Sequence, residues 1–167
     1  LYEAINFVKS KYGKENMKQK VVILDPTGGK YSQKKAEEFS KLNHLIVVCG
    51  HYEGLDARIK EFVDEEISIG DFIVTGGEIP AMLVIDSVAR LKKGVIAENA
   101  TNTESFSGEE KILEYPQYTR PENFKNLMVP KILLSGNHSK IEDWRNKQAV
   151  EITNKRRPDL ISKKQTK

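Results

Sequence analysis

Short apolar runs alternate with stretches of helical periodicity over the first half of the chain. Apolar residues recur at helical spacing from Leu1, which predicts an amphipathic helix that ends near Gly13. Two apolar runs, 21–24 and 45–49, are each followed by a glycine-containing loop, as expected of buried strands that end in tight turns. Another extended segment is predicted to start at Ile67.

Helical patterns separate and follow these strands. The predicted helices run from Ser32 to about Leu42, from Leu55 to about Glu65, and from about Pro80 to Leu91. Strands that alternate with helices in this way predict an α/β domain with a mostly parallel sheet.

The pattern changes after residue 93. Residues 94–116 are rich in Asn, Thr, Ser and Gly and have no clear period, which predicts a flexible interdomain linker. Beyond the linker, a region rich in Lys and Arg has helical character from about His138 to Arg157. The sequence therefore predicts three parts: an α/β domain in residues 1–93, the linker, and a small, mainly helical C-terminal domain in residues 117–167.

Composition limits the class of protein. The 167 residues are 38% hydrophobic and 31% charged, as in an ordinary globular protein. No apolar run approaches the ~18–20 residues of a membrane span, and no signal-peptide pattern opens the chain. Cys49, the single cysteine, ends an apolar run and is predicted to be a buried, inert thiol in a reducing cytoplasm. A catalytic cysteine with His51 as its base is the weaker interpretation.

Charge is unevenly distributed along the chain. Residues 1–118 hold 15 Lys and Arg against 19 Asp and Glu, whereas residues 119–167 hold 12 against 5. A basic C-terminal part of this kind is typical of a module that binds a polyanion, although a solvated basic tail has the same composition. Trp144, Arg145, Arg156 and Arg157 are candidates there for a core aromatic residue and phosphate contacts.

Three glycine-bearing loops follow the three predicted strands, at residues 25–29, 50–54 and 68–78. In an open α/β sheet, ligands bind outside the carboxyl ends of the strands, and glycine lets the backbone approach a ligand closely. The loops therefore predict one pocket, suited to an adenine, a ribose and an amino-acid tail. The chain has no GxGxxG, Walker, GxSxG or zinc-ligand pattern, which favours S-adenosylmethionine over a nucleotide that needs a phosphate cradle.

Three charged residues that follow these loops in the sequence have both a structural and a functional interpretation. Asp86 and Arg90 are four residues apart on the predicted apolar helix, where a surface ion pair is one interpretation. An arginine on a mostly buried helix needs a partner or a ligand, which makes Arg90 a candidate for the site. Glu104 lies in the predicted linker, where a solvated carboxylate is the default interpretation.

Six segments of the chain together resemble the signature segments of bacterial tRNA (guanine-N1)-methyltransferases. They are residues 50–56 (GHYEGLD), 68–72 (SIGDF), 75–81 (TGGEIPA), 85–90 (IDSVAR), 118–121 (YTRP) and 134–138 (LSGNH). They follow the order and approximate spacing of that family. The resemblance extends over essentially the whole chain.

The resemblance implies a SPOUT domain, whose backbone forms a trefoil knot at the cofactor site, and an obligate homodimer that shares its active sites. It also implies S-adenosylmethionine as the methyl donor, with Mg²⁺ as a possible cofactor that no residue here identifies. The implied cofactor-binding residues are Leu24, Asp25, Pro26, Gly50, Tyr52, Glu53, Gly54, Ser68, Ile69, Gly70, Phe72, Ile73, Val74, Gly76, Gly77 and Pro80.

The resemblance also implies the reaction. The methyl group would go to N1 of the guanine immediately 3′ of the anticodon in tRNA, and the basic C-terminal domain would bind the tRNA backbone. Glu104 would be the general base, and Arg90 would stabilise negative charge on the guanine.

Several positions depart from the family pattern. Glu104 replaces the usual aspartate, Asp25 stands where a smaller polar residue is common, and His51 stands where arginine is common. The chain opens with Leu1 at what resembles the family's first helix after an N-terminal strand, so the leading elements are expected to be missing. A non-catalytic RNA-binding SPOUT remnant, and a SPOUT enzyme that methylates ribose or another base, are the alternatives.

Overall fold

The structure is a computed structural model that describes residues 1–97 and 100–162. The chain divides into two compact units, Leu1–Glu98 and Asn99–Lys167, and the division falls within the predicted linker. None of the helices in the described ranges is long and apolar enough to cross a membrane.

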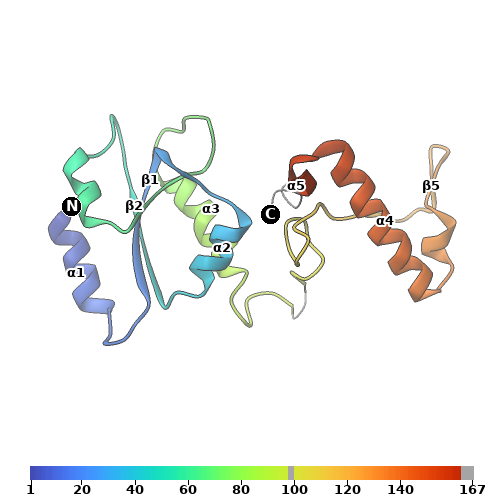
Figure 1. Ribbon diagram of the computed structural model, residues 1–167, viewed down its shortest axis with the longest axis horizontal. Coiled ribbons are helices and arrows are strands. Elements are labelled where there is room, and N and C mark those ends of the chain that lie inside the picture. Colours follow the sequence, from blue (N-terminus) through green and yellow to red (C-terminus); the bar gives the residue numbers. More distant parts are fainter. Residues whose placement is uncertain (98–99, 163–167) are drawn as a thin grey trace. The chain divides into compact units, whose positions relative to one another are not determined.

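A three-stranded parallel sheet forms the centre of the first unit (Figure 1). The strands are β1 (Gln19–Lys30), β2 (His44–Cys49) and β3 (Glu65–Ser68), in the order β2-β1-β3. Both neighbouring pairs are parallel, so the predicted parallel sheet is confirmed. Because the strands are parallel, their carboxyl ends meet at one edge of the sheet, and the three predicted loops meet there too.

Helices cover both faces of this sheet. Helix α1 (Tyr2–Tyr12) lies on one side, and α2 (Gln33–Ser40) and α3 (Glu78–Ala89) lie on the other (Figure 1). Successive residues of β1 point to opposite faces, as the pleat of a strand requires. Val21 and Ile23 therefore pack in the core on the α1 side, and Val22 packs in the core under α2 and α3.

Strand β1 is longer than the predicted run 21–24. Its pairing with β3 shifts register between Leu24 and Gly29, after which Gly29 and Lys30 pair with Ile67 and Ser68. The residues between form a bulge that sends the chain outward at the edge of the sheet. Gly28 makes this possible, because a Cβ at this position would lie 2.4 Å from the backbone nitrogen of Ile67.

The helix predicted from Leu55 to about Glu65 is wrong in type and length. It is a short 3₁₀ helix, η1 (Ala57–Phe62), capped by the Asp56 carboxylate, which accepts from the Arg58 amide at 2.9 Å. After η1, Asp64 forms two hydrogen bonds with Val21 of β1. The Val21 amide donates to Asp64 Oδ2 at 2.6 Å, and the Asp64 amide donates to the Val21 carbonyl at 2.9 Å. These tertiary hydrogen bonds stop the helix and start β3 at Glu65.

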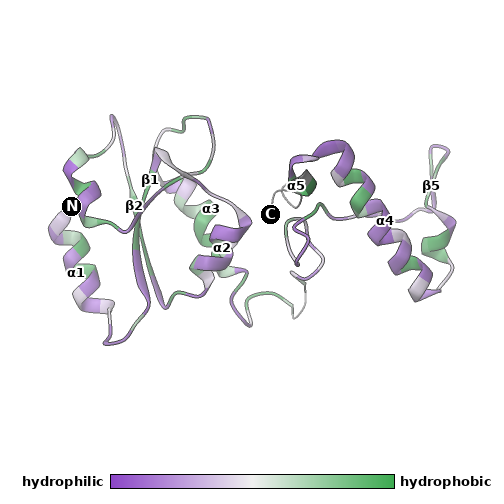
Figure 2. Ribbon diagram, viewed as in Figure 1, coloured by the Kyte–Doolittle hydropathy of each residue, from purple (hydrophilic) through white to green (hydrophobic). Residues whose placement is uncertain are grey.

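The second unit is built around one long helix, α4 (His138–Arg156). Its N-cap Asn137 accepts from the Lys140 amide at 3.1 Å, and the predicted Lys/Arg-rich helix is confirmed. Figure 2 shows α4 to be mostly hydrophilic, with apolar positions between. The remaining elements are β4 (Asn123–Phe124), β5 (Leu127–Met128), η2 (Lys131–Leu134) and α5 (Asp159–Ser162).

Part of the predicted linker packs within this second unit. The Leu113 amide donates to Thr153 Oγ1 at 3.0 Å, and the Arg145 guanidinium lies 4.8 Å from the centre of the Tyr115 ring. The segment therefore contacts the buried face of α4, where Ala149 and Thr153 lie.

Candidate functional site

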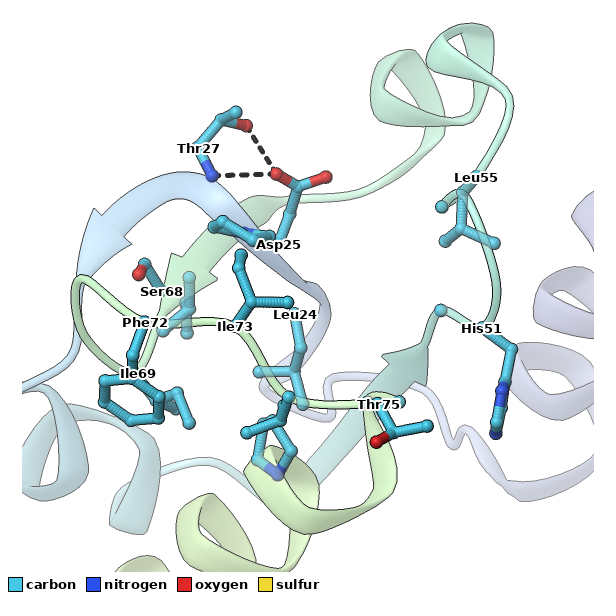
Figure 3. A pocket seen from close by; sticks show the side chains of 18 of the residues that line it. Leu24, Asp25, Thr27, His51, Leu55, Ser68, Ile69, Phe72, Ile73 and Thr75 are labelled. Atoms are coloured by element: carbon cyan, nitrogen blue, oxygen red, sulfur yellow. Dashed lines mark hydrogen bonds between the residues drawn. The ribbon is translucent and has the colours of Figure 1, made fainter.

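The three loops at the carboxyl edge of the sheet enclose a pocket of about 390 Å³ (Figure 3). The first loop leaves β1 at Leu24, the second follows β2 from Gly50, and the third follows β3 and enters α3. This volume lies within the range of small-molecule sites, and the position is the one at which open parallel sheets bind ligands.

Every residue that the family resemblance implied for cofactor binding lines this pocket, from Leu24 in the first loop to Pro80 at the start of α3. Five further residues line the pocket that are absent from the cofactor-binding set implied by the resemblance: Thr27, His51, Leu55, Ile67 and Thr75. Each lies in a glycine-bearing loop or directly beside one, so this position in the sequence was the signal that could have identified it.

Glycines hold the second and third loops together. The Gly77 amide donates to the Gly50 carbonyl at 2.9 Å, and His51 forms an isolated antiparallel bridge with Gly76. A Cβ on Gly77 would lie 2.7 Å from Cα of Cys49 and 2.9 Å from the nitrogen of Gly50. The pocket wall therefore needs glycine at position 77 for close backbone approach rather than for an unusual φ.

Gly77→Ala is expected to lower the free energy of unfolding by about 1–3 kcal/mol, because the added methyl group overpacks the wall. It should also weaken the binding of S-adenosylmethionine, measured by titration calorimetry beside denaturant unfolding. Gly29→Ala is the matched control, because its Cβ would meet only the Glu66 carbonyl oxygen, at 3.8 Å. Unchanged stability and affinity in Gly77→Ala would contradict the close approach described here.

The charges on the pocket wall are mainly negative. Asp25 and Glu53 line it, and its described lining includes no Lys or Arg. Hydrogen bonds from the Thr27 hydroxyl and amide hold the pKa of Asp25 below its ordinary value, so this carboxylate is ionised at neutral pH. Such a wall suits a ligand with cationic groups and disfavours a polyphosphate.

Cys49 is exposed, so the prediction of a buried thiol is wrong. The residue is the last of β2, and burial changes there from the buried Val48 to the exposed Cys49. Partial desolvation and the negative charge of Glu78 raise the pKa of the thiol. Because a nucleophilic cysteine needs a lowered pKa, the environment does not favour catalysis by Cys49. His51 instead contacts Glu78, with 3.1 Å between Nε2 and Oε1.

Helix α3 is buried on one face only, which corrects the expectation of a mostly buried helix. Its buried residues face the sheet: Pro80, Ala81, Val84 and Val88. Its other side exposes large apolar residues: Ile79, Met82, Leu83 and Ile85. The difference arises because the helix carries apolar residues on both sides, and such a sequence does not show which of the two sides the rest of the chain covers.

Arg90 and Glu104 belong to different units of the chain. Arg90 is the half-buried C-cap of α3, and its amide donates to the Asp86 carbonyl at 3.1 Å. Glu104 is half-buried in a turn, where its carbonyl accepts from the Ser107 amide at 3.1 Å. The backbone of each candidate is therefore held by a hydrogen bond within its own unit.

The candidate tRNA-contacting residues lie on or next to α4. Trp144 is half-buried, with its ring 6.3 Å from that of Tyr118, as expected of a core aromatic residue. Arg156 and Arg157 are exposed, and Arg157 is paired with Asp159 at 2.7 Å. No group of three or more His, Cys, Asp or Glu side chains in the described part of the chain is arranged to hold a metal ion.

Known proteins that are similar to this chain share one description. The family described as tRNA (guanine-1)-methyltransferase TrmD matches residues 1–163. The tRNA (guanine-N(1)-)-methyltransferases of Listeria monocytogenes serovar 1/2a and Bacillus pumilus are each 50% identical to the chain over 163 residues. That match covers 96% of this chain and 65% of each relative. The Bacillus subtilis protein of the same name is 54% identical over 144 residues, which cover 85% of this chain and 58% of that protein. The chain thus spans just under two thirds of the length of these relatives, and it belongs to the tRNA (guanine-1)-methyltransferase family.

Proposed function

We propose that the protein transfers a methyl group from S-adenosylmethionine to N1 of the guanine immediately 3′ of the anticodon in tRNA. The observation that carries this proposal is the pocket at the carboxyl edge of the sheet, lined by residues of the family's signature segments. The names of the relatives state the same reaction class for those longer proteins.

The pocket fits S-adenosylmethionine on its own chemistry. Its wall is rich in glycine backbone, carries the ionised Asp25, and has no Lys or Arg in its described lining. S-adenosylmethionine supplies an electrophilic methyl group on a cationic sulfonium. The loop residues around Leu24, Gly50 and Ile69 would bind it, and the carboxylates would favour its positive charges over a phosphate.

Two residues of the chain would perform the proton and charge chemistry. Guanine N1 carries a proton and is a poor nucleophile until that proton leaves. Glu104 is the general base that takes this proton, and the turn with Ser107 orients its backbone. Arg90 stabilises the negative charge that then develops on guanine O6. The half-buried position of Arg90 supports this role, because partial desolvation strengthens the interaction.

The same proposal includes a homodimer. The apolar side of α3 exposes Ile79, Met82, Leu83 and Ile85 next to the pocket residue Pro80. An apolar patch of this kind marks an interaction surface, and a second copy of the chain is its proposed partner. An active site shared between subunits would allow Glu104 and Arg90 to act on one guanine.

The proposal also covers the path of the protein backbone at the pocket, the contacts with tRNA, Mg²⁺ and the location of the protein. The hydrogen bond from Gly77 to Gly50 and the His51–Gly76 bridge support a SPOUT trefoil knot at the pocket. Residues 94–116 would connect the domains, and the exposed cations near the end of α4 would contact tRNA phosphates. Mg²⁺ is assigned no residue and no step, and the cytoplasm is the proposed location.

Methyl transfer to defined tRNA transcripts tests the function. Labelled S-adenosylmethionine is supplied with a transcript that has guanine next to the anticodon and with a matched transcript that has adenine there. We expect incorporation only with guanine, and digestion of the product should yield N1-methylguanine. Tight tRNA binding without incorporation would favour a non-catalytic RNA-binding protein, and a methyl group on ribose or another base would favour a different SPOUT enzyme.

A further inference from the structure

A lysine outside the pocket contacts its first loop through a small charge network. The Lys60 ammonium, on η1, donates to Thr27 Oγ1 at 3.2 Å and to Glu66 Oε2 at 2.5 Å, and lies 3.6 Å from Asp25 Oδ2. Asp25 and Thr27 line the pocket, whereas Lys60 and Glu66 do not. The network therefore connects the pocket wall to η1 and β3.

The Asp25 carboxylate is held in one orientation. The Thr27 amide and hydroxyl both donate to Asp25 Oδ1, at 2.8 Å and 2.6 Å (Figure 3). The hydroxyl of Thr27 thus donates to Asp25 and accepts from Lys60. Only 24% of the Asp25 side chain is exposed. A partly desolvated carboxylate is costly unless hydrogen bonds and a counter-charge accompany it, and Thr27 and Lys60 supply both.

Glu66 in turn holds Lys60 in place. Neighbouring residues of a strand point to opposite faces of the sheet. Glu66 accordingly contacts Lys60, whereas Glu65 contacts Lys20 and Lys35 on the other face. The Lys60 ammonium therefore lies between the Glu66 carboxylate on β3 and the loop of residues 25–27.

We infer that Lys60 is a positioning residue that holds the loop of residues 25–27 in its ligand-binding shape by offsetting the charge of Asp25. The inference rests on the proposed function only in its choice of S-adenosylmethionine as the probe. It also accounts for an acid in the pocket wall, because Lys60 offsets the charge of Asp25. Lys60 does not line the pocket, so it acts on a bound ligand through Asp25 and Thr27.

A double-mutant cycle with Lys60→Met and Asp25→Ser tests this coupling, with S-adenosylmethionine affinity measured by calorimetry. Lys60→Met alone is expected to weaken binding about tenfold, as for residues in one charge network. In the Asp25→Ser background, the same change should have an effect of less than about threefold, because no carboxylate remains to be offset. Lys60→Arg should retain most of the affinity, since it keeps the cation.

Lys35→Met is the matched control. Its ammonium contacts two carboxylates, Glu65 at 2.5 Å and Glu38 at 3.0 Å, and its side chain is 26% exposed against 31% for Lys60. Lys35 does not line the pocket, so its loss should affect stability without the affinity change. Equal effects of Lys60→Met in both backgrounds, or equal effects of Lys60→Met and Lys35→Met on affinity, would overturn the inference.

Amide hydrogen exchange of residues 24–30 gives a second, ligand-free measurement. Lys60→Met should speed exchange of the Thr27 amide, which donates to Asp25, whereas Lys35→Met should not. If the unaltered protein bound no S-adenosylmethionine, the proposed function would fail while this exchange measurement still decided the role of Lys60. Unchanged exchange of Thr27 in Lys60→Met would refute the positioning role.

Discussion

Arg90→Ala is expected to lower the rate of methyl transfer by about 10²–10³-fold, the usual cost of removing one preorganised charge-stabilising group. The reason is that negative charge on guanine O6 would lose its cation. The measurement is single-turnover transfer of labelled methyl to the guanine-bearing transcript. Arg90→Lys should recover part of the rate, because it keeps a positive charge at the end of α3.

Two binding measurements separate this role from a structural one. Arg90→Ala should leave the affinity for tRNA and for S-adenosylmethionine within about threefold of the original, since a lost transition-state contact lowers turnover without weakening ground-state binding. Equal losses of tRNA affinity and turnover would remove Arg90 from the proposed mechanism. The unfolding midpoint should be recorded for each variant, because Arg90 is also the C-cap of α3.

Glu104→Gln is expected to reduce methyl transfer by about 10²–10⁴-fold, the range for removal of a general base. The amide has nearly the same shape as the carboxylate but cannot take the N1 proton. Single-turnover transfer of labelled methyl to the guanine-bearing transcript is the measurement.

Glu114→Gln is the control for this series. Glu114 lies in the same part of the chain, and its side chain accepts from Gln117 at the chain surface. It should leave the rate within about twofold of the original, as is usual for surface substitutions. Glu104→Asp should remain active, because aspartate keeps a carboxylate that can take the proton. A Glu104→Gln enzyme with the original rate would assign the base elsewhere.

The sequence predicted the elements whose signals are local. The apolar runs 21–24 and 45–49 became the cores of β1 and β2, and the basic pattern after residue 137 became α4. Glycine after a strand predicted each pocket loop, because such turns depend on the conformational freedom of the residues themselves. The pocket could therefore be anticipated, and the resemblance to a family supplied the ligand.

Local signals failed where a distant part of the chain decides the outcome. The helix predicted from Leu55 is shortened because Asp64 hydrogen-bonds to Val21, over forty residues earlier in the sequence. Cys49 is exposed although it continues an apolar run, because β2 ends at this residue and the core ends at Val48. The exposed apolar side of α3 has the same hydrophobic pattern as a fully buried side, so periodicity could not distinguish them.

The sequence by itself thus determined the order of the elements, the parallel sheet, the three glycine loops and the family. Only the tertiary structure decided which side chains meet. The order β2-β1-β3 places β1 between the other strands, and this brings Lys60 and Glu66 to Asp25 and Thr27. The return of the third loop onto the second brings Gly77 against Gly50. These contacts join residues far apart in sequence, and their physical cause is the packing of the sheet rather than any local preference.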